Sequence, residues 1–147
     1  QKQVSQSGNG LFMSDQTMQL DSFYSAVMQR GNLRTPEHAA RTSSAVLHSL
    51  GFNLSGGVKR ELARALPPDL AHELTRGWRL IHFRNTHLPL EKFARDVALH
   101  SGNTDPQYAR MAIAAVFGQL KRLVDDDLSR RVAKDLSPEV RDLWNAA

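Results

Sequence analysis

The sequence of 147 residues contains no cysteine. A disulfide framework, a thiolate metal site and a cysteine nucleophile are therefore excluded together. No stretch approaches the roughly 18 consecutive apolar residues of a membrane-spanning helix, so no membrane segment is expected. No charged region followed by an apolar one opens the chain, so no secretory signal is expected. These features predict a cytoplasmic protein.

Recognisable catalytic motifs are also missing. The sequence has no Gly-x-Ser-x-Gly elbow, no phosphate-binding loop and no dinucleotide-binding glycine pattern. Its six histidines form no His-Glu-x-x-His or other metal-ligand spacing. The run Asp125-Asp126-Asp127 lacks the spaced oxygen ligands of a calcium loop, and the start of a helix explains it better. We therefore predict no cofactor, no metal and no enzymatic activity.

Alternation of apolar and polar residues with a period of two is absent over any useful length, which argues against a sheet. With 41% hydrophobic and 23% charged residues, the composition is that of an ordinary globular protein. What the sequence does contain is apolar residues at helical spacing, for example Leu20, Phe23 and Val27. This pattern predicts an all-α fold.

The sequence also repeats itself at a distance of 70 positions. Residues 20–74 align with residues 90–144 without a gap, and twelve positions are identical, whereas chance would give about 3 or 4. The identical pairs are Leu20/Leu90, Phe23/Phe93, Val27/Val97, Pro36/Pro106, Ala39/Ala109, Ala45/Ala115, Val46/Val116, Leu50/Leu120, Arg60/Arg130, Ala63/Ala133, Leu66/Leu136 and Pro68/Pro138. The coincidence of the prolines shows that more than a shared helical pattern is repeated.

Six further pairs are apolar in both copies, namely Leu47/Phe117, Leu54/Val124, Val58/Leu128, Leu62/Val132, Leu70/Val140 and Leu74/Trp144. Each copy divides into four helices, so we predict about eight helices in two homologous repeats with a pseudo-twofold arrangement. The predicted organisation is a disordered leader (1–19), repeat 1 (20–74), a connector (75–89) and repeat 2 (90–147), with 20–147 as one compact domain. Residues 1–12 are interpreted as an addition to the natural chain, or else Leu11-Phe12 packs onto the domain.

Proline and glycine mark the expected helix ends. The second helix of each repeat should begin at Pro36 and Pro106, because proline at the first helical position loses no hydrogen bond. In Ser137-Pro138-Glu139 we expect an N-cap followed by the first two helical residues. Gly31 and Gly102 stand where left-handed C-caps are expected.

Together these positions resemble the bacterial family known as domain of unknown function 2267. The matching residues are Phe23, Val27, Ala45-Val46-Leu47, Leu62-Ala63, Leu66-Pro67-Pro68, Gly77-Trp78, Phe93, Val97, Ala115-Val116-Phe117, Leu136 and Leu143-Trp144. The sequence departs from the family pattern at Gly51, Gly56 and Gly57, where a more charged loop would be expected. The resemblance implies a helical, cytoplasmic, bacterial protein, and it implies no established activity.

The connector differs in charge from the repeats. Repeat 1 carries six basic and five acidic residues, and repeat 2 carries nine of each, whereas the connector has three arginines and no acid. Most of the formal net charge of +4 therefore comes from the connector. Arginines interleaved with aromatic rings suit anionic partners, so the candidate binding residues are Arg76, Trp78, Arg79, His82 and Arg84. Alternatively, the apolar connector residues pack on the helices while the arginines are solvated.

Three functions remain open. The first is a non-enzymatic interaction or adaptor module, in which another protein or a peptide helix binds a groove beside Trp78. The second is binding of nucleic acid or an anionic ligand through the connector, for which a net charge of +4 is modest. The third is an enzyme with an unrecognised site. The sequence leaves both a monomer and a homodimer open.

Overall fold

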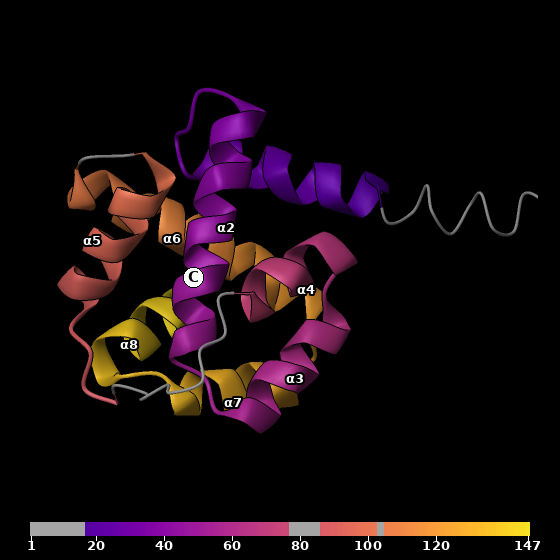
Figure 1. Ribbon diagram of the computed structural model, residues 1–147, viewed down its shortest axis with the longest axis vertical. Coiled ribbons are helices and arrows are strands. Elements are labelled where there is room, and N and C mark those ends of the chain that lie inside the picture. Colours follow the sequence, from indigo (N-terminus) through magenta and orange to yellow (C-terminus); the bar gives the residue numbers. More distant parts are fainter. Residues whose placement is uncertain (1–16, 77–85, 103–104) are drawn as a thin grey trace, which may run out of the picture.

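The computed structural model describes residues 17–76, 86–102 and 105–147 (Figure 1). Within these ranges the regular structure is entirely helical, so the all-α prediction is confirmed. A first helix covers 17–30, and it includes residues 17–19 that were assigned to the leader, since Met18 and Gln19 are good helix formers. It is followed by α2 (Pro36–Phe52), α3 (Gly56–Ala65), α4 (Pro68–Thr75), α5 (Leu90–Ser101), α6 (Pro106–Leu123), α7 (Asp126–Asp135) and α8 (Pro138–Ala146).

The helix starts lie where the sequence predicts them. The Thr35 hydroxyl accepts a hydrogen bond from the His38 backbone N–H (3.0 Å), and the Asp125 carboxylate accepts one from Leu128 N–H (2.8 Å). These contacts satisfy backbone donors that have no partner inside the helix. Ser137 is the N-cap residue of α8, as predicted, but its hydroxyl makes no capping bond and donates to the carbonyl oxygen of Leu88 (2.6 Å) instead. Its place before Pro138 is nevertheless as expected.

The predicted left-handed turns are half correct. Gly102 has φ 81° and ends α5, as expected. In the turn after the first helix, Asn32 and not Gly31 has the positive φ, at 57°. Asparagine is one of the few residues that tolerate this conformation. Gly31 is needed for packing instead, because a Cβ there would lie 2.7 Å from the carbonyl oxygen of Val27 and 3.2 Å from Cα of Ala112. Asn32 and Gly102 are themselves 70 positions apart.

One hydrophobic core joins residues of 20–74, here called the first half, with residues of 90–147, the second half. The predicted apolar pairs are largely buried on both sides, although Leu20, Val58, Ala63, Leu90 and Val124 are only half-buried. Trp144 is fully buried, with its ring 5.1 Å from that of Phe117. Burial of such side chains contributes about 1.5–3 kcal/mol each, so the shared core is the main source of stability.

Helix α2 lies in the middle of the molecule, with α5 and α8 on one side and α3 and α4 on the other (Figure 1). Its main packing partners are α5 of the second half and α4 of the first. A pseudo-twofold arrangement would bring residues 70 positions apart together near the axis. Glu61 and Arg131 are such residues and form an ion pair between α3 and α7. The contact is compatible with the arrangement, which stays a prediction.

Candidate functional site

The predicted binding residues fall mostly beyond the described ranges. Trp78, Arg79, His82 and Arg84 lie outside the described residues, so the connector site stays a prediction. Arg76 is described, and it ends α4, where its backbone N–H donates to His72 O (2.8 Å). Its guanidinium lies in a recess that the sequence analysis did not foresee.

This recess, here called the α4 recess, lies where α2, α4 and the end of α5 meet. Its volume is about 400 Å³, within the range of small ligand pockets. It is lined by Arg41, Ser44, Ala45, His48, Glu73, Arg76 and His100. Two guanidinium groups, two imidazoles and one carboxylate therefore converge on one hollow.

The carboxylate in the α4 recess is already engaged. Glu73 Oε1 forms an ion pair with Arg76 Nε at 3.0 Å, one turn along α4. The Glu73 side chain is 19% exposed, whereas the Arg76 side chain is 55% exposed and can still turn toward a ligand. Burial raises the pKa of Tyr24, and the nearby charges of Asp69 and Glu73 raise it further. Glu73 thus forms an ion pair with Arg76 and lies near enough to Tyr24 of the first helix to raise its pKa.

Arg41 has no such partner. Among the described residues, no acidic side chain pairs with its exposed guanidinium. A planar guanidinium offers five N–H donors and binds carboxylate or phosphate in a bidentate geometry. Arg41 is therefore the cation of the α4 recess that is best placed to take an external anion.

The two histidines lie side by side. Their ring centroids are 6.2 Å apart, and His48 also packs edge-on against Phe52 at 5.0 Å. His100 Nδ1 lies 2.7 Å from the carbonyl oxygen of Asp96. Because a carbonyl can only accept, Nδ1 carries the proton, which leaves Nε2 as the nitrogen for other contacts.

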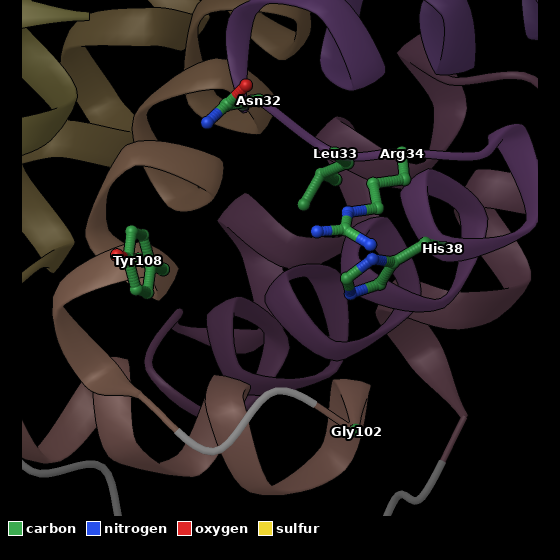
Figure 2. A pocket seen from close by; sticks show the side chains of 7 residues that line it. Asn32, Leu33, Arg34, His38, Gly102 and Tyr108 are labelled. Carbon is green, nitrogen blue, oxygen red and sulfur yellow. The ribbon is translucent and has the colours of Figure 1, made fainter.

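A second hollow, the turn recess, lies between the turn that precedes α2 and the end of α5. It has a volume of about 510 Å³ and is lined by Gly31, Asn32, Leu33, Arg34, His38, Gly102 and Tyr108. Figure 2 shows Arg34 and His38 together on one side and Tyr108 on the other. A cation, an imidazole and a phenol thus border this recess.

The two recesses share one face of α2. His38 lines the turn recess, and Arg41, Ser44 and His48 line the α4 recess. Spacings of three and four residues place these side chains on one side of a helix. We call these four residues the α2 stripe. Arg34 and Arg76 lie at its ends, so that three arginines border a face whose recesses contain a single carboxylate among the described residues.

The second half does not carry this chemistry at the corresponding positions. Seventy residues after the α2 stripe, α6 has Tyr108, Met111, Ala114 and Gly118. Leu143 and Ala146 stand in place of Glu73 and Arg76. The two halves therefore share their core positions and differ in polarity on this outer face.

Sequence reasoning missed the α2 stripe because it searched for catalytic motifs and for regional net charge. A usable signal was present, since the positions at which the aligned repeats disagree in polarity include 38, 41 and 48. The contributions of Glu73 and His100 could not be found in this way. They reach the recess only through the packing of α4 and α5 against α2.

The recesses are suited to binding charged groups. Charge-assisted hydrogen bonds from arginine to a carboxylate or phosphate are about twice as strong as neutral ones. The described residues contain no group of three or more His, Asp or Glu side chains that could hold a metal ion. Across the same residues, no helix is long and apolar enough to cross a membrane.

Comparison with known proteins supports the family resemblance. The family described as "Uncharacterized conserved protein (DUF2267)" matches residues 20–143, which covers both halves and the connector. No curated protein matches the chain. The extent of the match shows that the chain belongs to the DUF2267 family.

Proposed function

We propose that the protein is a non-enzymatic interaction module that binds acidic side chains of a partner protein along the α2 stripe. The observation that carries the proposal is that three arginines and three histidines line two recesses that share one face of α2. Glu73, the one carboxylate among the described residues that line these recesses, is paired with Arg76, which leaves Arg41 for a partner.

The charge of this face favours an anion. Arg34, Arg41 and Arg76 contribute three positive charges, and Glu73 contributes one negative charge. Acidic groups would therefore be attracted to the stripe before they contact it.

An acidic protein segment suits the rest of the molecule better than nucleic acid does. The second half carries nine basic and nine acidic residues, so it adds no net positive charge that would favour a phosphate backbone. From His38 to His48 the stripe spans about 15 Å, the length of a short peptide segment. Nucleic-acid binding through the connector remains the alternative outcome of the test, and the cytoplasmic location stays a prediction.

The test is fluorescence anisotropy with a labelled glutamate-rich peptide of about 20 residues, long enough to cover the stripe. We expect binding at about 50 mM salt that weakens at about 200 mM, because salt screens exposed charges. Arg41→Met should weaken binding about tenfold, the value of one charge-assisted contact. The circular dichroism spectrum should not change, since Arg41 is exposed and unpaired among the described residues.

Arg64→Met provides the matched control. Arg64 is an exposed arginine of α3 that lies outside both recesses, so its loss changes the net charge equally. If both variants weaken binding to the same extent, only net charge matters and the α2 stripe is not a site. Tighter binding of a DNA or RNA oligonucleotide than of the peptide would favour the nucleic-acid alternative.

A further inference from the structure

The second half exposes an apolar surface where the first half exposes the α2 stripe. Tyr108 is 61% exposed and Met111 is 50% exposed, one turn apart on α6. Ala114 and Gly118 continue the same face and are half-buried. We call these four residues the α6 face.

The α2 stripe and the α6 face meet at the turn recess. His38 belongs to the stripe, Tyr108 belongs to the α6 face, and both line this recess (Figure 2). Each occupies the third position of its helix, since α2 begins at Pro36 and α6 at Pro106. Arg41 and Met111 follow one turn further along α2 and α6.

We infer that the α6 face is the apolar part of the same docking surface, and that the partner segment carries apolar side chains next to its acidic ones. This inference rests on the proposed function and adds the chemical class of the partner. Acidic side chains would contact Arg41 of the stripe and the arginines at its ends, while an apolar side chain would cover Met111 and Tyr108. The turn recess lies between the two contacts.

Charge complementarity selects this occupant. A second copy of the chain placed face to face would bring the arginines of the two stripes together, and like charges in contact are unfavourable. A nucleic-acid strand would satisfy the arginines but would offer no aliphatic group to Met111. An acidic amphipathic segment satisfies both surfaces, with affinity from apolar burial and specificity from charge.

The experiment compares two labelled peptides of about 20 residues, the length needed to span both surfaces as a helix. Peptide A has glutamate and leucine at helical spacing, and peptide B has glutamine in place of every leucine. We expect peptide A to bind at least about fivefold more tightly than peptide B, because burying one apolar side chain contributes that much. Met111→Gln should remove this advantage and leave the binding of peptide B unchanged.

Met18→Gln is the matched control, since Met18 is 65% exposed on the first helix and lines neither recess. It should leave both affinities as they are. If peptides A and B bind equally and Met111→Gln changes neither, while Arg41→Met weakens both, the α6 face is not part of the site and the proposed function stands. If neither peptide binds at about 50 mM salt, the proposed function itself fails.

Discussion

The two halves hold the end of their last helix in different ways. In the first half, Gly51 of α2 lets the backbone of α4 approach so closely that a Cβ at this position would lie 2.2 Å from the carbonyl oxygen of Leu74. Seventy positions later, Lys121 of α6 extends its ammonium group to the carbonyl oxygens of Trp144 (2.9 Å) and Ala147 (2.9 Å). Direct backbone contact in one half is thus replaced by a charged side chain in the other.

This difference has a consequence for the candidate site. The close approach at Gly51 holds the last turn of α4 against α2, which places Glu73 and Arg76 beside His48 in the α4 recess. In the second half the residue that corresponds to His48 is Gly118, and the last turn of α8 carries Leu143. Closely related helix pairs therefore support a polar recess in one half and an apolar face in the other.

The largest effect on stability is expected at the buried residue in the last turn of each half's final helix, Leu74 or Trp144. Trp144→Ala should lower the free energy of unfolding by about 3–5 kcal/mol, because it leaves a large cavity against Phe117. Leu74→Ala at the corresponding position should cost about 2–5 kcal/mol, with the smaller side chain giving the smaller loss. Urea denaturation of both variants measures the difference. Equal losses of stability in the two variants would show that the larger indole ring makes no more stabilising contacts than the leucine side chain.

A matched pair of glycines tests the close approach itself. Gly51→Ala should destabilise the protein by about 1–3 kcal/mol, because a backbone oxygen would have to move. Gly118→Ala should instead stabilise it by about 0.5–1 kcal/mol, since alanine is the better helix former. A Cβ at Gly118 would meet only Ala147 C, at 3.8 Å. Thermal denaturation should therefore show shifts of opposite sign, and two stabilised variants would contradict the close approach.

The smallest effect is expected at Lys121, which stands 70 positions after Gly51. Lys121→Met should lower the free energy of unfolding by about 1 kcal/mol. The ammonium group donates hydrogen bonds to the terminal carbonyl groups of α8 and interacts favourably with the negative end of its dipole. The loss should shrink at high salt, which screens charge–dipole interactions. Lys92→Met is the control, as its i,i+4 pair with Asp96 is exposed. Urea denaturation at low and high salt would show that the stability lost in Lys121→Met depends on salt more than the stability lost in Lys92→Met. If it does not, only the packing of the aliphatic part of the Lys121 side chain contributes.

Much of the fold could be predicted from the sequence. Pro36, Pro106 and Pro138 begin helices as expected, and paired apolar positions such as Val46 and Val116 are buried. Proline and helical periodicity act within one or two turns, so a local pattern is sufficient. The left-handed conformation predicted for Gly31 is wrong, and Ser137 is the predicted N-cap without a capping bond, because its hydroxyl donates to the distant Leu88.

The candidate site depended more on tertiary structure. The sequence directed attention to the connector, and of its candidate binding residues Arg76 alone is described and lines the α4 recess. The polar face of α2 was present in the sequence as Arg41 and His48, but a polar helix face is usually solvated and does not by itself indicate a site. It becomes a recess because α4 and α5 pack on either side of it.

By itself, then, the sequence determined the helices, the pairing of core positions at a distance of 70 residues and the family, since these follow from short-range periodicity and from residue identity. Only the tertiary structure decided which outer faces lie together. Glu73 and His100 are 27 positions apart in the chain, and they share one recess with Arg41 because α4 and α5 both pack against α2 around the common core.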